Sequence, residues 1–520
     1  MLEEERKYEV PDDFEVPDLS PVAPTGARVE SRSPVRLVAT YFDTADLRLA
    51  RSGVSLRHRR GEPEPWTVKL PTDTVGVRHE VSRPGPRRAG VPADLVELVT
   101  VFARGADLAP VATIRTSRRR HQVRAADGAL LAEVADDRVT VLDEAGRAAG
   151  KFREVEVERR GGDADLLEQL DGLLTAAGAE SGSFLPKHVR ALRFVVPEQV
   201  GALGTDPEGE PDLVAPAGLP DDPAAGDVVT EAVRRAVFRL LTHDPLVRLR
   251  VPVPGSHRSA LQQMRVGCRR LRSDLRTFAP LVVPEWSRPL REELRWLAGV
   301  LGAARDVEVL RARLRRTAEA DPLGPLDAGA VDRLDAALAA RQETALAEVD
   351  EALRSPRYVA LTDALVLAAR APRLRPRAAA PAAEKLPRLV RRPWRKLTAS
   401  VGADAAGLDP LGPDDHWHEV RKEAKRARYA VNAVAGVVGK DARKLAEALA
   451  DVQRLLGEHQ DAAVAADTWI ELATASGDPG AALVAGRLVE RERATVRRVR
   501  ADFPSAWVRA DRGRRTGWLR

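Results

Sequence analysis

The spacing of apolar residues changes once along this chain, and the change separates two kinds of structure. In residues 1 to about 197, charged and apolar residues alternate within short segments such as SLRHRR, PWTVKL and REVEVERR. Successive side chains of a strand point to opposite faces, so this pattern predicts antiparallel β-structure. From residue 227 to about 510, apolar residues recur every three or four positions in long Ala, Leu and Arg segments, which predicts helices. We therefore expect an α+β multidomain protein.

The stretch between these two patterns is rich in Gly, Pro, Ala and acidic residues and has no periodicity. It covers residues 198–226 and is typical of a linker. A chain of 520 residues also exceeds what one hydrophobic core usually serves. The predicted domains are therefore 1–197 and 227–510. Within the helical part, proline-rich segments near 280–289 and 371–387 predict breaks between helices.

Composition limits which cellular compartment and which class of protein we expect. Hydrophobic residues make up 44% of the chain and charged residues 31%, which is typical of a globular protein. Cys268 is the only cysteine, so no disulfide can form within the chain and a cytoplasmic location is expected. No signal-like segment and no run of roughly 18 apolar residues is present, so no membrane association is expected. The net charge of +6 is small beside 83 basic and 77 acidic residues, so the grouping of charges is more informative than their sum.

The helical part contains an internal repeat. MRVGCRRLRSDL at 264–275 aligns without gaps on VRKEAKRARYAV at 420–431, and all four basic positions coincide. About 30 residues later, each copy has a Leu-Gly pair followed by an acid, in LGAARD and in LGEHQD. This order predicts two related bundles, over about 227–370 and 385–510, facing each other about a pseudo-twofold axis.

The first strand-like segment places three charged side chains on one face. Glu3, Glu5 and Lys7 are two residues apart, as are Glu154, Glu156 and the third glutamate of REVEVE. Like charges on one face repel unless cations compensate them, and hard divalent cations prefer such oxygen ligands. A strand face open to solvent gives the same pattern, and either motif alone favours that plainer interpretation.

Basic residues recur with the same period between the two acidic segments. They are Arg57 and Arg59 in SLRHRR, Lys69 in WTVKL, Arg78 in VRHEV, and Arg118 and Arg120 in TSRRRH. Strands with acids on some faces and bases on others can close into a barrel with a charged interior. A polyanion that chelates a divalent metal would fill it, because arginines bind phosphate oxygens and carboxylates hold the metal. Glu133 and Asp137 share a face in LLAEVADDRV and add to the metal side, whereas Asp136 is expected in a turn or on the outer face.

These segments occur in a characteristic order: an E-x-E-x-K start, YFDT at 41–44, the LRHRR arginines, WTVKLP, EVADD and the EVEVE strand. The ordered set, over about residues 1–197, resembles the CYTH family of triphosphate tunnel metalloenzymes. The resemblance implies an eight-stranded antiparallel β-barrel tunnel that cleaves tripolyphosphate, or less often thiamine or nucleoside triphosphates, with Mg²⁺ or Mn²⁺. The chain has no GxxxxGK[ST] loop, so a P-loop enzyme is not expected.

Together, the residue pattern and the resemblance give a role to each candidate. The expected catalytic residues are Glu5, Lys7, Arg57 and Arg59. The expected substrate-binding residues are Lys69, Arg78, Arg118, Arg120 and Lys187, of which the last, in LPKHVRAL, has an ordinary surface lysine as its alternative. The expected metal ligands are Glu3, Glu5, Glu133, Asp137, Glu154 and Glu156. In such a site one metal would bind the substrate oxygens and a second would activate water for in-line attack.

Each repeat segment predicts a helix with a basic stripe beside an apolar stripe that, in the first copy, contains Cys268. The segments, with LGAARDVEVL and LLGEHQDA, resemble the CHAD family over about 227–510. The resemblance implies two helical bundles with a basic surface or cavity that binds inorganic polyphosphate. The expected polyphosphate-binding residues are Arg265, Arg269, Arg272, Arg276, His418, Arg421, Lys425 and Arg428. Gln262 stands where the family often has a histidine, and Asp306 and Asp461 are expected to orient arginines through ion pairs. For one helix alone, a solvated basic face is the alternative.

The leading prediction is a metal-dependent inorganic triphosphatase whose helical domain binds polyphosphate. Tripolyphosphate and nucleoside triphosphates present the same phosphate oxygens, so both are candidate substrates. The alternative is a non-catalytic polyphosphate-binding protein. Nucleic-acid binding is not favoured, because the basic stripes contain few aromatic residues for stacking apart from Tyr429.

Overall fold

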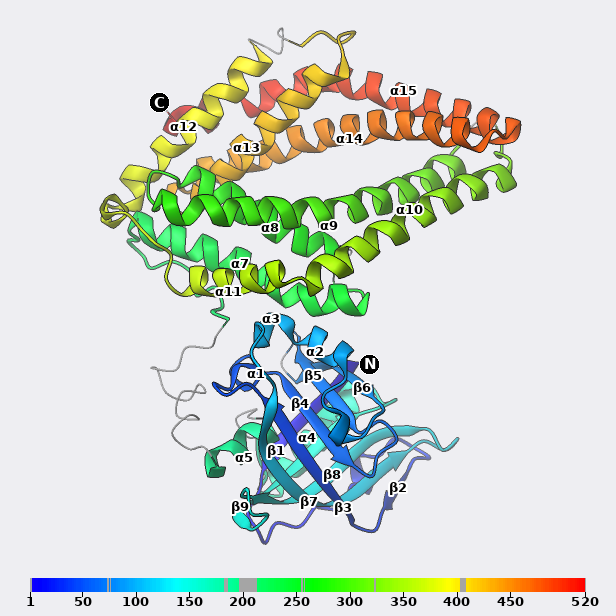
Figure 1. The fold of residues 1–520 in the computed structure, drawn as a ribbon, viewed down its shortest axis with the longest axis vertical. Coiled ribbons are helices and arrows are strands. Elements are labelled where there is room, and N and C mark those ends of the chain that lie inside the picture. The colour runs from blue at the N-terminus through cyan, green and yellow to red at the C-terminus, as the bar shows by residue number, and fades with distance from the viewer. Residues whose placement is uncertain are drawn as a thin grey trace. The chain divides into compact units, whose positions relative to one another are not determined.

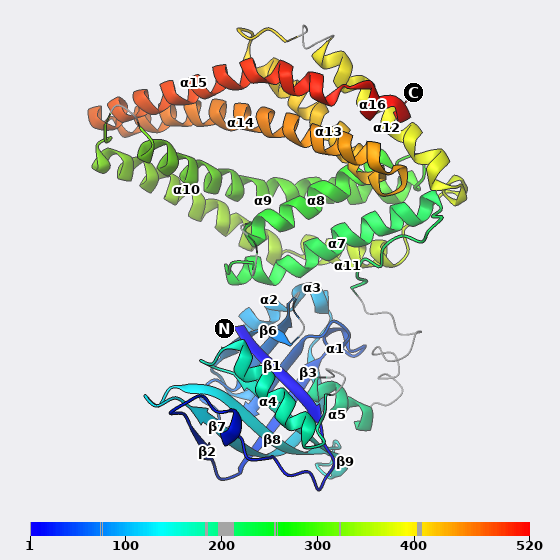
Figure 2. The same ribbon diagram turned by 180° about the vertical axis from the view of Figure 1, so that it is seen from behind.

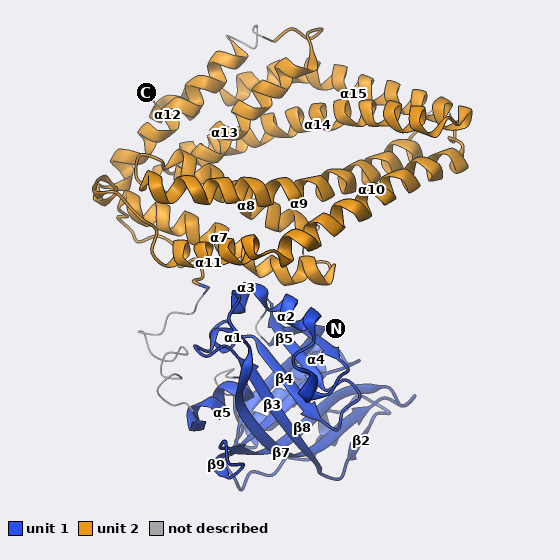
Figure 3. Ribbon diagram, viewed as in Figure 1, with its two compact units in different colours: residues 1–213 blue, residues 214–520 orange. Residues whose placement is uncertain are grey.

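The protein forms two compact units, residues 1–213 and 214–520, shown in different colours in Figure 3. The computed structural model describes residues 2–72, 74, 76–181, 186–195, 213–253, 256, 258–321, 324–402 and 408–519. Residues 198–212 of the predicted linker lie outside this description. The first unit is built on strands and the second on helices (Figure 1).

A closed β-barrel forms the first unit. Its strands are β1 (Leu2–Glu9), β3 (Val35–Asp43), β4 (Ser55–Arg60), β5 (Trp66–Pro71), β6 (Val77–Arg83), β7 (Ala109–Arg124), β8 (Leu130–Leu142) and β9 (Ala148–Arg159). The hydrogen-bonded order is β1-β6-β5-β4-β3-β7-β8-β9, and β9 pairs again with β1. All of these pairings are antiparallel, which confirms the predicted eight-stranded antiparallel barrel. Two short strands, β2 (Arg28–Ser31) and β10 (Glu180–Ser181), pair with β7 and β1 beside the ring.

The register of the barrel places its charged faces inside. Across β1 and β9, Glu5 lies opposite Glu158 and Lys7 lies opposite Glu156. Directly opposite residues share a face of the sheet, so the acidic positions of both strands point the same way. The intervening valines of β9 point outward and join a buried cluster with helix α4 (Ala164–Ala176). This part of the hydrophobic core therefore lies on the outer surface of the barrel.

Helix α5 (Lys187–Val195) fills one end of the barrel. Its Leu192 belongs to one buried cluster with Val139 and Val141 of β8. These valines continue along β8 the face that carries Asp137, so they point into the barrel. The interior is therefore apolar at the α5 end and charged beyond it.

Helices make up the second unit, as predicted (Figures 1 and 2). They are α7 (Ala225–Leu249), α8 (Ala260–Thr277), α9 (Pro284–Glu319), α10 (Ala328–Arg354), α11 (Pro356–Arg370), α12 (Ala382–Val401), α13 (Asp414–Val438), α14 (Lys440–Ser476), α15 (Pro479–Ala510) and α16 (Gly513–Thr516). The predicted break between helices near 280–289 is longer than the observed one, because α9 already begins at Pro284 and contains Pro289. Proline is tolerated at the first position of a helix, where its missing N–H has no partner to lose.

The internal repeat appears as two equivalent helix pairs. Helices α8 and α9 carry the first copy and α13 and α14 carry the second. The two repeat helices, α8 and α13, contact each other, and each packs on the long helix that follows it. Cys268 is fully buried on the apolar side of α8, as expected for a core residue.

Candidate functional site

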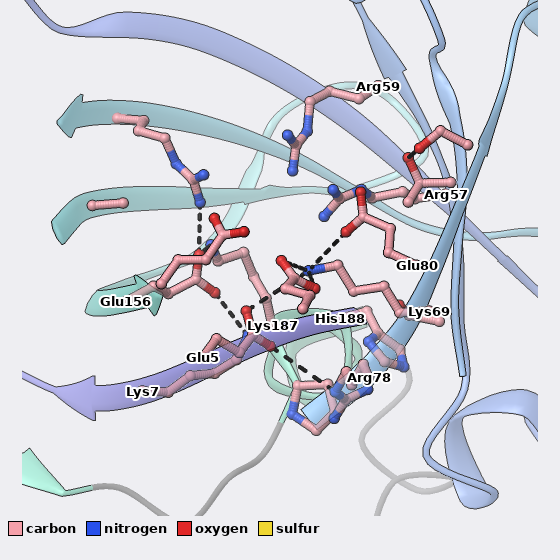
Figure 4. A pocket seen from close by; sticks show the side chains of 18 of the residues that line it. Glu5, Lys7, Arg57, Arg59, Lys69, Arg78, Glu80, Glu156, Lys187 and His188 are labelled. Atoms are coloured by element: carbon pink, nitrogen blue, oxygen red, sulfur yellow. Dashed lines mark hydrogen bonds and ion pairs between the residues drawn. The ribbon is translucent and has the colours of Figure 1, made fainter. Parts of the chain in front are cut away.

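A cavity of about 280 Å³ runs inside the barrel, and all eight barrel strands contribute to its lining (Figure 4). Nine basic and seven acidic residues line it, so both charge types needed for a metal–polyanion complex are present. Most residues that the sequence analysis singled out meet here. Those lining the cavity are Glu3, Glu5, Lys7, Arg57, Arg59, Lys69, Arg78, Arg118, Arg120, Glu133, Glu156 and Lys187.

Two candidate metal ligands, Asp137 and Glu154, are buried behind this lining. Asp137 accepts two hydrogen bonds from Arg118, at 2.8 and 2.6 Å, and contacts the ammonium of Lys187. Glu154 lies 3.0 Å from Lys187 Nζ and 3.1 Å from Arg190 Nη1. With Glu156, these two carboxylates form a group whose oxygens lie within 4.8 Å of one another and could hold a metal ion.

The lining residues to which the sequence analysis gave no role include Glu80, Glu158 and His188. Glu80 is two residues from Arg78 on the same strand, and Glu158 completes the alternation of REVEVE. The period-two pattern therefore carried a signal for both acids. No periodicity points to His188, because it lies at the start of α5 and reaches the cavity only through the packing of that helix.

One acidic group surrounds Lys69. Its Nζ lies 2.7 Å from Glu3 Oε1, 3.7 Å from Glu5 Oε2 and 3.4 Å from Glu80 Oε2. Burial together with the neighbouring Glu3 raises the pKa of Glu158 to about 7. Burial also raises the pKa of Glu3, against the attraction of Lys69. Negative charge in this group is therefore only partly compensated.

The second acidic group is more fully compensated. Lys7 Nζ lies 2.7 Å from Glu156 Oε1 and 3.3 Å from Glu5 Oε1, and Arg118 Nη2 donates to Glu156 Oε2 at 2.7 Å. Burial opposes ionisation of Glu156, but Lys187, Lys7 and Arg118 outweigh it and hold its pKa well below the usual range. This carboxylate is ionised and held in an ion-pair network.

Arg57 differs from most of the other tunnel cations. Its Nε is buried and has no hydrogen-bond partner among the described residues. Arg120 also has a buried Nε without a hydrogen-bond partner among the described residues, but that Nε lies 3.5 Å from Glu133 Oε1. By contrast, Arg59 Nη1 lies 2.8 Å from Glu62 and Arg78 Nη1 donates to the carbonyl of Gly53 at 3.0 Å. A buried guanidinium N–H without an acceptor favours binding of an anion at this point of the tunnel.

A larger cavity, of about 930 Å³, lies in the helical unit among α8, α9, α13 and α14. Seven of the expected polyphosphate-binding residues line it: Arg265, Arg269, Arg272, Arg276, His418, Arg421 and Lys425. Gln262 lines it as well, on the first copy of the repeat. Arg428 does not line it and instead donates to Gln453 of α14 at 3.0 Å. Further cations, Arg295, Arg305, Arg313, Lys422 and Arg426, complete a strongly basic lining.

Equivalent ion pairs recur in the two copies of the repeat. Arg265 Nη1 lies 2.9 Å from Asp306 Oδ1, and Arg421 Nη2 lies 4.0 Å from Asp461 Oδ1. These are the pairs expected from the aligned segments. Lys425 lies deeper, and burial together with nearby Arg269 and Arg421 lowers its pKa to about 7. The cavity therefore holds more positive charge than its own carboxylates neutralise.

Fold and cavities together define a two-domain protein in which a charged β-tunnel precedes a duplicated helical domain with a basic cavity. A family model of the CYTH domain matches residues 1–187, and one of the CHAD domain matches residues 231–469. The chain therefore belongs to the family of proteins that join an N-terminal CYTH domain to a CHAD domain. The CYTH domain places the first unit among the triphosphate tunnel metalloenzymes, which are metal-dependent enzymes of the phosphohydrolase or cyclase kind.

Two relatives of similar length are the uncharacterized proteins Rv2226 and MT2285 of Mycobacterium tuberculosis. Each is 32% identical over 535 residues, covering 98% of this chain and 96% of the relative. Among solved structures, PptA from Streptomyces chartreusis is 27% identical, with a TM-score of 0.44, and the match covers 55% of this chain and 99% of that one. Two further matches are a putative adenylate cyclase from Bacillus halodurans and the putative adenylyl cyclase HpAC1 from Hippeastrum, described as having a dominant triphosphatase activity. The Bacillus halodurans protein is 16% identical, with a TM-score of 0.26, and the match covers 36% of this chain and 96% of that one. HpAC1 is 19% identical, with a TM-score of 0.25, and the match covers 37% of this chain and 95% of that one.

Among the helices of the described residues, none combines the length and apolarity that crossing a bilayer requires.

Proposed function

We propose that the barrel hydrolyses the terminal phosphate of inorganic triphosphate in a metal-dependent reaction. The observation that supports this most directly is the buried Nε of Arg57, which has no hydrogen-bond partner among the described residues and lies in a closed tunnel that also contains a partly compensated carboxylate group. An anion bound at Arg57 would compensate the positive charge of the arginine. A divalent cation bound at the carboxylates would compensate their negative charge. A triphosphate chelating Mg²⁺ or Mn²⁺ supplies both.

The residues around Lys69 fit a divalent metal. Glu3, Glu5 and Glu158 present carboxylate oxygens, the ligand type that Mg²⁺ and Mn²⁺ prefer. The pKa of Glu158 near 7 reflects burial first and then the negative charge of Glu3, and a bound cation would favour the ionised carboxylate. When bound, the metal would neutralise negative charge on the phosphate oxygens. Asp137 and Glu154, by contrast, hold Lys187 and Arg118 in place, so we assign them a supporting role.

The tunnel cations divide the binding of substrate between them. The Nε–H of Arg57, which has no partner among the described residues, can donate to a phosphate oxygen, and Arg59 lies on the same face two residues away. Arg118 and Lys187 are fixed by their carboxylate partners, so they can offset charge in the transition state without reorganising.

The lining also favours inorganic triphosphate over a nucleoside triphosphate. Among the described residues that line the cavity, Ala135 and Pro186 alone have purely apolar side chains. Binding sites for a base or another organic group are mostly apolar, with few polar groups. A tunnel lined by sixteen charged residues offers little surface of that kind.

The test measures phosphate release from tripolyphosphate by the full chain in the presence of Mg²⁺ or Mn²⁺. We expect metal-dependent release that Arg57→Ala reduces by about 10²-fold, the scale of one lost transition-state contact. Arg115→Ala is the matched control, because Arg115 lies on β7 and is exposed. Absence of release from the unmodified protein would contradict the proposal and leave the non-catalytic alternative.

We also propose that the helical cavity binds inorganic polyphosphate. A cavity with this excess of arginine and lysine needs a polyanion to offset the mutual repulsion of its cations. The measurement is calorimetric titration of the full chain with long-chain polyphosphate, with duplex DNA as competitor. Charge reversal by Arg269→Glu should weaken binding, whereas preferential binding of DNA at physiological salt would contradict the assignment.

A further inference from the structure

His188 lines the tunnel, but the mechanism above gives it no role. Its side chain is 4% exposed and its ring stacks on Tyr41, with centroids 5.4 Å apart and planes inclined by 24°. Its Nε2 is buried and has no hydrogen-bond partner in the described part of the chain. Buried polar atoms without partners are uncommon and destabilising, so this atom points to a ligand that enters the tunnel. Figure 4 shows the side chains of His188 and Arg78 beside each other.

The protonation state of the ring follows from its other contact. The imidazole forms a hydrogen bond with the backbone carbonyl of Val54, which can only accept. Because Nε2 has no hydrogen-bond partner among the described residues, the proton lies on Nδ1, which donates a hydrogen bond to the carbonyl of Val54. Burial, reinforced by Arg78, Lys7 and Arg57, lowers the pKa of His188 to about 3, so the ring is neutral. Nε2 therefore presents a lone pair to the tunnel.

The surroundings restrict what that lone pair can bind. An ionised phosphate oxygen has no proton to donate and would be repelled by Nε2. A divalent cation at Nε2 would face repulsion from Lys7, Arg57 and Arg78, the charges that act most strongly on the ring. A water molecule has an O–H to donate, and the same three cations would stabilise the negative charge that develops as it loses a proton.

We infer that Nε2 of His188 binds and orients the water that attacks the terminal phosphorus, which makes His188 a catalytic residue of the proposed triphosphatase. The water oxygen forms the new bond to phosphorus. The bond from that phosphorus to the bridging oxygen breaks, and its electron pair stays on the departing pyrophosphate. One water proton moves to Nε2, and the imidazolium then passes it to the pyrophosphate, which restores the neutral ring. The negative charge of bound substrate favours this proton uptake. The inference rests on the proposed function.

Two substitutions separate the acceptor from the packing of the ring. In His188→Asn, the side-chain amide can still donate near Val54, but nothing occupies the position of Nε2. In His188→Gln, a longer side chain places a carbonyl oxygen near that position. The matched control is His79→Asn, because His79 is also buried with an unpartnered Nε2 but does not line the tunnel. The assay measures kcat, KM and the pH profile for tripolyphosphate, together with calorimetric binding of tripolyphosphate without metal.

We expect His188→Asn to lower kcat by about 10²-fold, while KM and the metal-free binding of tripolyphosphate change by less than threefold. His188→Gln should retain more of the rate than His188→Asn. The low-pH limb of the kcat profile should disappear in His188→Asn, and His79→Asn should match the unmodified protein. Unchanged kcat in His188→Asn, or a loss matched by equal losses of binding and of Tm, would overturn this role but leave the triphosphatase proposal standing. An unmodified protein that releases no phosphate would overturn both.

Discussion

Arg118 and Asp137 face each other across β7 and β8, and the guanidinium donates to both carboxylate oxygens, with distances of 2.8 Å from Nε to Oδ1 and 2.6 Å from Nη2 to Oδ2. Asp137 is fully buried and also contacts Lys187, which comes from α5 rather than from the barrel. One carboxylate thus joins the barrel wall to the helix that fills its end.

Asp137→Ala should be strongly destabilising, because buried Arg118 and Lys187 lose one of the two carboxylates that they share and keep only Glu156 in common. Removing one member of a buried ion pair typically costs about 3–5 kcal/mol in free energy of unfolding. Calorimetric unfolding of the full chain should show a lowered transition for Asp137→Ala. The control is Arg119→Ala, on the exposed face of β7. A transition unchanged in Asp137→Ala would contradict the structural role of this carboxylate.

Glu158→Gln should weaken binding of the divalent metal more than it weakens the fold. The substitution removes one carboxylate from the group around Lys69 and also relieves its repulsion with Glu3, so stability should not fall. We expect the affinity for Mn²⁺, measured by electron paramagnetic resonance, to drop by about tenfold or more. Glu97→Gln, in a residue outside the tunnel lining, serves for comparison. Equal Mn²⁺ affinity in both variants would move the metal site away from Glu158.

Binding of polyphosphate to the helical cavity should weaken as the pH rises above 7. Lys425 is half-buried, and burial together with Arg269, Arg421 and Arg265, opposed by Asp461, lowers its pKa to about 7. A bound polyanion favours the protonated amine and so raises this pKa. Binding then takes up protons between the two pKa values, and affinity falls over that window by at most about tenfold per pH unit.

The pH effect can be measured by titrating polyphosphate at constant ionic strength from pH 6.5 to 9. Lys425→Arg keeps a cation whose charge does not titrate in this range, so its affinity should vary much less with pH. A pH dependence of equal size in Lys425→Arg would assign the effect to another group.

Arg313 and Glu492 form a buried pair that joins α9 to α15, with Nη2 2.6 Å from Oε2, and Arg313 also bonds Glu458 at 2.9 Å. Glu492→Ala should cost about 3 kcal/mol or more in free energy of unfolding, because Arg313 keeps only its more exposed partner. Replacing both residues, as Arg313→Met with Glu492→Leu, should cost less than Glu492→Ala alone. Chemical unfolding of the unmodified protein, Glu492→Ala and the double variant tests this, and a double variant destabilised as much as Glu492→Ala or more would contradict the prediction.

Much of the barrel could be predicted because alternation along a strand fixes which side chains share a face. Glu3, Glu5 and Lys7 share a face for this reason. The same pattern also grouped Glu154 with Glu156, although Glu154 and Asp137 lie behind the cavity lining. Alternation says nothing of the height of a residue along the barrel, which depends on the stagger between strands. Arg428 shows the helical counterpart, since it shares a stripe with Lys425 but bonds Gln453 outside the cavity lining.

The sequence by itself determined the two kinds of structure, the charged faces of the strands and the equivalence of the two repeat helices, because all three follow from local periodicity and from comparing the chain with itself. Only the tertiary structure decided which charges meet. It brought Lys187 and His188 of α5 into a tunnel built from distant strands, left the buried Nε of Arg57 without a hydrogen-bond partner among the described residues, and crowded Glu158 against Glu3. Ion pairing and burial depend on distances of a few ångströms across the closed barrel, which no pattern along the chain contains.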